Sequence, residues 1–129
     1  MRLLLDTSVL IDALRLRHRR RELLAKLVQA GHTLATSALN IAEVYAGMRP
    51  DEAQRTEALL GALDCYELTG TSGRRAGAMK QQWSQKGRTL ALADTIVAAI
   101  ALERGCILMT DNRKDFPMEE LNKFDPPER

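Results

Sequence analysis

Short apolar segments alternate with helical patterns along the chain, and this alternation constrains the fold more than any single motif. The apolar segments lie at residues 2–5, 33–36, 65–68, 106–109 and 121–124. Because parallel strands need a long crossover, usually a helix, such an alternation predicts right-handed βαβ units. We therefore expect an α/β fold, in which a short parallel sheet of four to five strands carries helices on both faces.

Caps and helix breakers predict where the helices lie. A threonine or serine directly after residue 6 can cap a first helix, and Ser37 can cap a helix that runs to about residue 48. An apolar helix over residues 92–104 is closed by Gly105. Other helices are expected at about 19–30 and 51–63, and residues 70–73 are expected to form a loop before a helix that ends near residue 87.

Length and composition indicate one globular domain. The chain has 129 residues, the size of a single domain with its own core, so we expect residues 1–129 to fold as one unit. Hydrophobic residues make up 45% and charged residues 28%, which disfavours both disorder and a membrane-spanning protein. The net charge of +2 neither requires nor excludes a nucleic-acid partner.

The two cysteines and the start of the chain indicate the compartment. Cys65 and Cys106 are too few for a disulfide framework, and each begins an apolar segment, so both are expected to be buried free thiols. No secretory pattern of charged and apolar residues opens the sequence. We expect a cytoplasmic protein that has no membrane partner.

Four carboxylates occupy positions that solvation alone does not explain. Asp6 directly follows the first apolar segment, and Asp111 follows the fourth. Ligands of parallel α/β sheets bind outside the carboxyl ends of the strands, which is where both residues fall. Glu43 and Asp94 are single charges within apolar helical stretches. Although each of the four alone is compatible with an ordinary cap, turn or surface position, together they predict one acidic crevice.

An acidic crevice of this kind requires a cation. Carboxylates that lie close together raise one another's pKa, and burying one without a partner costs several kcal/mol. No lysine or arginine lies in sequence beside Glu43 or Asp94. His18 and His32 stand apart without a partner at zinc-ligand spacing, whereas oxygen ligands suit Mg²⁺ or Mn²⁺. We therefore expect a magnesium site, with manganese as the alternative ion.

Four sequence blocks, in this order, resemble the PIN domains of bacterial VapC toxins. They are LDTSVLID at 5–12, TSALNIAEVYAG at 36–47, LADTIVAA at 92–99 and LMTDNRKDF at 108–116. The resemblance extends over essentially the whole chain, and it implies a metal-dependent endoribonuclease that is the toxin of a type II toxin–antitoxin pair. The alternative is a non-catalytic RNA-binding module with a PIN-like fold, against which the intact acidic set argues.

The resemblance also implies roles for individual residues around one or two metal ions. The catalytic carboxylates are expected to be Asp6, Glu43, Asp94 and Asp111, and the metal ligands these four together with Asp115. Supporting hydrogen bonds are expected from Thr7, Ser8, Thr110 and Asn112. The fourth acidic position stays open, because Asn112 stands at the usual place in the Thr-x-Asp/Asn turn while Asp111 and Asp115 are the nearby carboxylates.

Two basic clusters are candidates for contacts with RNA phosphates. The denser one has five arginines within seven residues, namely Arg15, Arg17, Arg19, Arg20 and Arg21, and a solvated helical face explains it equally well. A weaker cluster consists of Lys80, Lys86 and Arg88. The resemblance further implies a cognate VapB-like antitoxin as partner and a homodimer formed through helical faces.

Overall fold

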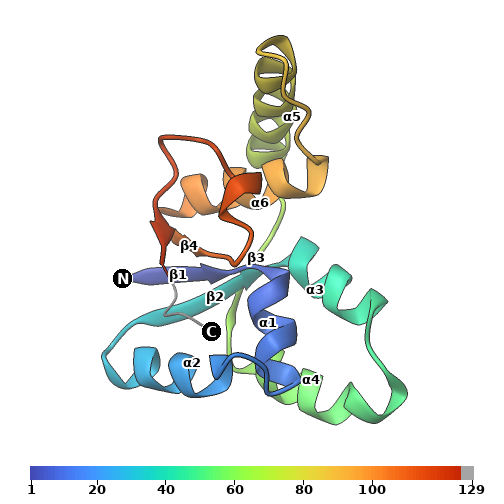
Figure 1. The fold of residues 1–129 in the computed structure, drawn as a ribbon, viewed down its shortest axis with the longest axis vertical. Helices are drawn as coiled ribbons and strands as arrows, with labels where there is room; N and C mark the ends of the chain where they lie inside the picture. The colour runs from blue at the N-terminus through green and yellow to red at the C-terminus, as the bar shows by residue number, and fades with distance from the viewer. Residues whose placement is uncertain (126–129) are drawn as a thin grey trace.

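Five strands form one parallel sheet in the computed structural model, which describes residues 1–125 (Figure 1). The order across the sheet is β3-β2-β1-β4-β5, and every neighbouring pair is parallel. The predicted α/β class is therefore confirmed. The strands are β1 (Arg2–Leu5), β2 (Thr33–Ser37), β3 (Asp64–Tyr66), β4 (Ile107–Met109) and β5 (Lys123–Phe124).

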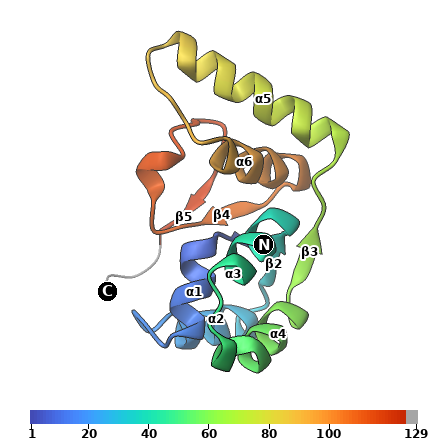
Figure 2. The same ribbon diagram turned by 90° about the vertical axis from the view of Figure 1, so that its right-hand side faces the viewer.

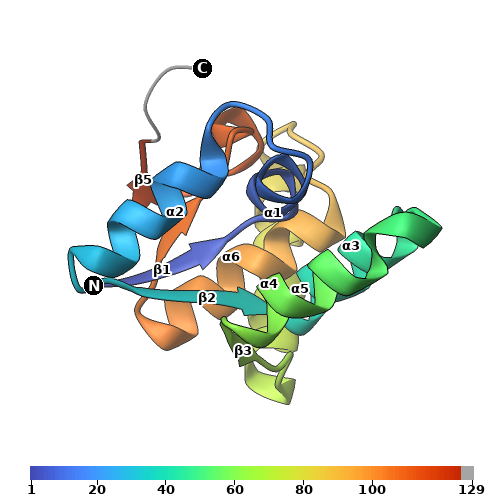
Figure 3. The same cartoon turned by 90° about the horizontal axis from the view of Figure 1, so that it is seen from below.

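Six α-helices join the strands within the described residues, and they cover both faces of the sheet (Figure 1). Seen from below, α1, α2 and α4 lie in front of the strands (Figure 3), whereas α5 and α6 cover the opposite face. None of the helices in this range is long and apolar enough to cross a membrane. The α-helices are α1 (Thr7–Leu14), α2 (Arg20–Gln29), α3 (Ala38–Ala46), α4 (Ala53–Gly61), α5 (Gly70–Gln85) and α6 (Leu92–Arg104), with short 3₁₀ helices η1 (Pro50–Glu52) and η2 (Arg113–Asp115).

Side chains of β1 alternate between two hydrophobic cores. Leu4 belongs to a core that also contains side chains of α5 and α6, whereas Leu3 and Leu5 belong to a core with side chains of α1, α2 and α4, and all three leucines are 0% exposed. A strand covered on both faces needs apolar side chains at every position, which explains why its sequence does not alternate with polar residues. The two cores fix the position of β1 and, with it, that of the residue that follows.

The strand order reverses between β1 and β4, which are neighbours at the centre of the sheet. From β1 the chain adds β2 and then β3 on one side, and it later adds β4 and β5 on the other. At the carboxyl end of this central pair, the Asp6 N–H donates to the Met109 carbonyl at 2.9 Å. Ligands of open parallel sheets bind at such a point, so Asp6 and the residues after Met109 lie where a site is expected.

Helix α5 begins earlier than expected, because residues 70–73 are helical rather than a loop. Thr69 and Ser72 form a reciprocal capping box, in which the Thr69 hydroxyl accepts the Ser72 N–H at 3.0 Å and the Ser72 hydroxyl accepts the Thr69 N–H at 2.9 Å. Those bonds satisfy two N–H groups at the helix start, and they outweigh the low helix propensity of Gly70 and Gly73.

The cysteines differ in burial. Cys106 is buried, as expected, but Cys65 is exposed and the expectation for it was wrong. Its strand, β3, begins at Asp64 and forms one edge of the sheet, where only Tyr66 of its three residues is buried. An edge strand has fewer neighbours to cover its side chains, so an apolar segment in the sequence was not sufficient evidence of burial.

Replacing Leu4 with alanine should lower the free energy of unfolding by about 3 kcal/mol, because the lost side chain leaves a cavity between the sheet and α6. Val28 on α2 is 56% exposed, so Val28→Ala should change the same quantity by less than about 0.5 kcal/mol. Urea unfolding followed by circular dichroism measures both values. Similar losses in the two variants would contradict the described core.

Candidate metal centre

Asp6 is a buried carboxylate whose two oxygens both accept hydrogen bonds. The Thr7 N–H donates to Oδ1 at 2.9 Å, and the Thr110 hydroxyl donates to Oδ2 at 2.7 Å. The Asn40 side-chain amide adds a longer bond to Oδ1 at 3.3 Å. Burial raises the pKa of Asp6, while the bonds from Thr110, Thr7 and Asn40 act in the opposite direction. These donors hold the carboxylate in one orientation at the end of β1.

Glu43 reaches the same region from the exposed face of α3. Its Oε1 accepts a hydrogen bond from the Thr7 hydroxyl at 2.7 Å, and that hydroxyl in turn accepts one from the Asn40 amide at 3.0 Å. Asn40 is 0% exposed, and it links Asp6 to Glu43 by way of the Thr7 hydroxyl. It was missed in the sequence, although a lone amide three residues before Glu43 on the same helix was a usable signal.

Asp94 lies in the first turn of α6, and its pKa is raised to about 6. Burial is the largest cause, followed by the negative charges of Asp6, Asp115 and Glu43. All of these contributions act in the same direction. Carboxylates from the end of β1, from α3 and from η2 are therefore close enough to oppose the ionisation of Asp94 on α6.

The acidic cluster, defined as Asp6, Glu43, Asp94 and Asp115, has an open arrangement. Within residues 1–125, no three side chains of the types Asp, Glu, His or Cys stand at the mutual distances of a closed metal site. Repulsion between like charges favours separation, and a divalent cation would oppose that repulsion. The donor set fits such an ion, since carboxylate oxygens alone are the ligands that Mg²⁺ and Mn²⁺ prefer.

Asp111 does not join the acidic cluster, contrary to expectation. Its Oδ1 accepts a hydrogen bond from Arg20 Nη2 at 2.9 Å, and the two side chains are only 6% and 3% exposed. A carboxylate held in a buried ion pair is a poor ligand for a second cation. Asp115, on η2, is instead the fourth member of the cluster, and its charge acts on Asp94 together with those of Asp6 and Glu43.

The expected supporting residues differ in what they contact. Thr7 and Thr110 donate to the acidic cluster as described, and the Asn112 backbone N–H donates to the Thr110 hydroxyl at 3.0 Å. Asn112 thus acts through its backbone, while its side chain is exposed. The buried Ser8 hydroxyl makes no hydrogen bond within the described residues, so the structure assigns it no supporting role.

The dense arginine cluster is largely engaged in ion pairs. Arg15 pairs with Glu52 at 3.1 Å, Arg19 with Glu22 at 3.5 Å, and Arg20 with Asp111 at 2.9 Å. Arg20 is also 2% exposed, so the prediction that it contacts RNA is wrong: its position at the start of α2 directs it inward. The two exposed members without an ion pair among residues 1–125 are Arg17 and Arg21.

Comparison with known proteins identifies the family. The profile of the PIN domain matches residues 3–118. This chain is a PIN-domain protein. Two PIN-family relatives from Mycobacterium tuberculosis are Ribonuclease VapC19, 31% identical over 115 residues, and Ribonuclease VapC10, 34% identical over 121 residues. The alignments cover 89% and 94% of this chain, and 92% and 90% of the relatives, so this PIN domain belongs with the VapC proteins.

Solved structures show the same PIN fold. VapBC2 from Rickettsia felis, bound to a promoter DNA fragment, aligns with a TM-score of 0.81 and 22% identity over 97% of this chain and 100% of that one. VapBC-1 from nontypeable Haemophilus influenzae aligns with a TM-score of 0.80 and 20% identity over 97% and 98%. At these identities the similarity establishes the fold.

Asp94→Asn should stabilise the metal-free protein at neutral pH. The pKa of Asp94 is raised from 3.8 to about 6, so ionisation of this carboxyl group opposes folding. The contribution of Asp94 to the free energy of unfolding is fully present below pH 3.8 and is lost as the pH rises through 6. In EDTA at pH 7.5, the variant should melt on the order of 3 °C higher than wild type, after allowance for solvent screening.

The same comparison at pH 4 should give nearly equal melting temperatures, because the carboxyl group is then largely protonated in the folded state. Differential scanning calorimetry across this range measures the trend. Asp51→Asn, in the exposed part of η1, is the matched control and should show no such gain. A gain for Asp94→Asn that is independent of pH would refute the electrostatic explanation.

Proposed function

We propose that this PIN-domain protein is a metal-dependent endoribonuclease and the toxin of a toxin–antitoxin pair. The observation that carries the proposal is the acidic cluster at the switch point of the sheet, where four chain segments bring carboxylates together at a cost in stability. The relatives named Ribonuclease VapC support RNA as the substrate. A non-catalytic RNA-binding module would gain nothing from a cluster that repels phosphates.

Asp6, Glu43, Asp94 and Asp115 are the residues that would hold one or two Mg²⁺ ions. Bound there, the metal would lower the pKa of a water molecule and offset negative charge on the phosphodiester. Mn²⁺ prefers similar oxygen ligands and is the natural substitute in experiments. The exposed position of Glu43 and the partial exposure of Asp94 leave this side of the cluster accessible to a large substrate.

The protein's own groups set the orientation and the protonation of the cluster. Thr110 and Thr7 hold Asp6, and Thr7 also fixes one oxygen of Glu43. Asp94 has no hydrogen-bond donor within the described residues, and its pKa of about 6 means that protons compete with a cation below that pH. Activity is therefore expected to rise with pH between 5 and 7.

In the proposed reaction, a water oxygen forms a bond to phosphorus while the bond from phosphorus to O3′ breaks. The water loses one proton, and the departing O3′ gains one. The products are a 5′-phosphate and a 3′-hydroxyl. Attack by the ribose 2′-hydroxyl would instead leave a cyclic phosphate. The proposed reaction does not require a histidine as general base.

The proposal includes a VapB-like antitoxin as partner, which is supported by structural neighbours that are VapBC complexes. A homodimer through helical faces, predicted from the family resemblance, is part of the same proposal. The compartment is proposed to be the cytoplasm, where RNA targets are found.

Asp6→Asn and Asp94→Asn should each reduce cleavage of a mixed RNA pool by at least about 100-fold, since each removes a ligand charge without changing side-chain size. EDTA should abolish wild-type cleavage, and added Mg²⁺ or Mn²⁺ should restore it. Sequencing of the new 5′ ends and phosphatase sensitivity identify the products. Asp51→Asn serves as control, and wild-type rates in folded Asp6→Asn protein would disprove the proposed site.

Asp115→Asn should weaken Mn²⁺ binding by about tenfold, whereas Asp111→Asn should weaken it by less than about threefold, because Asp111 is held by Arg20. Isothermal titration calorimetry on the two purified variants measures both affinities directly, without reference to RNA. A larger loss for Asp111→Asn than for Asp115→Asn would reverse the assignment of the fourth carboxylate.

A further inference from the structure

A long segment of this protein carries positive charge and no acidic residue. Residues 68–93 contain five basic residues and no Asp or Glu, which leaves 14 basic against 17 acidic residues in the rest of the chain. The segment comprises α5 and the turn that leads into α6. Its basic residues are Arg74, Arg75, Lys80, Lys86 and Arg88.

None of these five cations forms an ion pair within residues 1–125, unlike three of the five arginines at 15–21. An unpaired cation attracts phosphate more strongly than one whose field is cancelled by a neighbouring carboxylate. The structure therefore favours the cluster that looked weaker in the sequence.

The segment also lies in a suitable place. Helix α5 is the outermost element on its face, separated from the sheet by α6 (Figures 1 and 2). Its following turn approaches the acidic cluster, because the Arg88 guanidinium donates to the Lys114 carbonyl, next to Asp115. The Lys80 ammonium donates to the Leu90 carbonyl and ties the same turn to α5. One end of the basic segment is thus fixed beside the proposed metal site.

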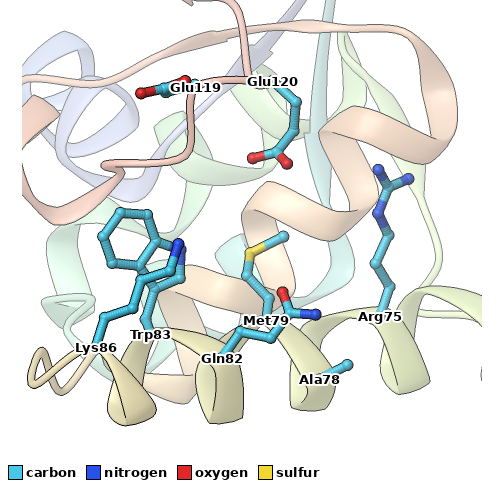
Figure 4. Close-up of a pocket in the computed structure, with 8 residues that line it drawn as sticks. All are labelled: Arg75, Ala78, Met79, Gln82, Trp83, Lys86, Glu119 and Glu120. Carbon is cyan, nitrogen blue, oxygen red and sulfur yellow. The ribbon is translucent and has the colours of Figure 1, made fainter.

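A cleft of about 410 Å³ lies along α5, and it contains none of the four carboxylates of the acidic cluster (Figure 4). Trp83 is the only tryptophan of the chain and forms part of one wall, with Lys86 Nζ 4.6 Å from the centre of its ring. Arg75 extends on the same side, Glu120 points toward α5 from the opposite wall, and Glu119 lies beside it on that wall (Figure 4).

This combination suits a single-stranded nucleic acid. Proteins that hold single strands combine cations along the backbone with an aromatic ring against which a base can stack. The volume of the cleft lies within the usual range for small-ligand sites. The two glutamates repel phosphate but accept hydrogen bonds from amino and imino groups, which are found on bases.

We propose that α5 and the turn after it, residues 70–88, hold the RNA strand beside the acidic cluster, with phosphates on the basic side chains and one base in the Trp83 cleft. The inference rests on the proposed nuclease function and adds where the substrate is bound. It replaces the arginines at 15–21 as the principal RNA contact.

The test measures RNA binding without cleavage. An Asp6→Asn background is titrated with a fluorescein-labelled 20-nucleotide single-stranded RNA of mixed sequence, and anisotropy is followed between 50 and 300 mM NaCl. In this background, R74Q/R75Q/K86Q should bind at least about tenfold more weakly at 100 mM salt. The slope of log affinity against log salt should fall by about 2, as three lost phosphate contacts predict for single strands.

A charge-matched comparison uses three exposed cations on the other side of the protein, in R17Q/R21Q/K26Q. Its affinity should fall by less than about threefold, since only the total charge has changed. Equal losses in the two triple variants would overturn the proposal, because the cations would then act only through net charge. Unchanged circular dichroism and melting temperature establish that both variants are folded.

Trp83 provides a second readout because it is the only tryptophan. RNA should quench its emission in the Asp6→Asn protein over the same concentration range as the anisotropy change. Saturating RNA that leaves the emission unchanged would contradict base binding in the cleft. A triple α5 variant with normal RNA affinity but an altered sedimentation coefficient would show instead that α5 contacts a second copy of the chain.

Failure of this inference is distinguishable from failure of the proposed function. Wild-type protein that cleaves RNA in Mg²⁺, while the α5 variant binds RNA normally, would overturn only the binding surface. Wild-type protein that neither cleaves nor binds RNA would overturn both.

Discussion

Repulsion among carboxylates at the carboxyl end of β1 is the constraint on which the rest of this structure depends. Asp6 can be held there only because apolar packing on both faces fixes β1, and because Thr7, Asn40 and Thr110 donate to its oxygens. The same arrangement opposes ionisation of Asp94. The packing of the two cores therefore offsets the loss of folding free energy that the acidic cluster causes. Functional sites often lower the stability of a fold in this way.

The acidic cluster is asymmetric in a way that matters for its chemistry. Asp6 is buried and held by three donors, whereas Asp94 is partly exposed and its pKa is raised by burial and by three neighbouring negative charges. One carboxylate is thus fixed in orientation, and the other is sensitive to pH near neutrality. Residues 68–93, in contrast, carry five basic residues and no carboxylate. The acidic side chains and the basic side chains thus lie on different elements, and the fold sets the distance between the two groups.

Local patterns predicted most of the fold, because apolar runs and caps act within a few residues. The bounds of α6 and the place of Asp6 followed directly from the sequence. Other features depend on contacts that sequence spacing does not reveal. Asp111 is paired with Arg20, which is 91 residues away in the sequence. Sequence spacing does not reveal this ion pair, and Asp111 was therefore expected in the acidic cluster.

The acidic cluster draws its members from segments that are far apart in the chain, and this has a consequence for the timing of synthesis. Asp6 and Glu43 emerge from the ribosome early, but Asp94 and Asp115 arrive only with α6 and η2. Strand β4 precedes the segment that carries Asp115. It must still insert beside β1 after more than three quarters of the sequence has been made. A nascent chain therefore holds half of the cluster, and the proposed nuclease would stay inactive towards the ribosome that is translating it until the central strands have paired.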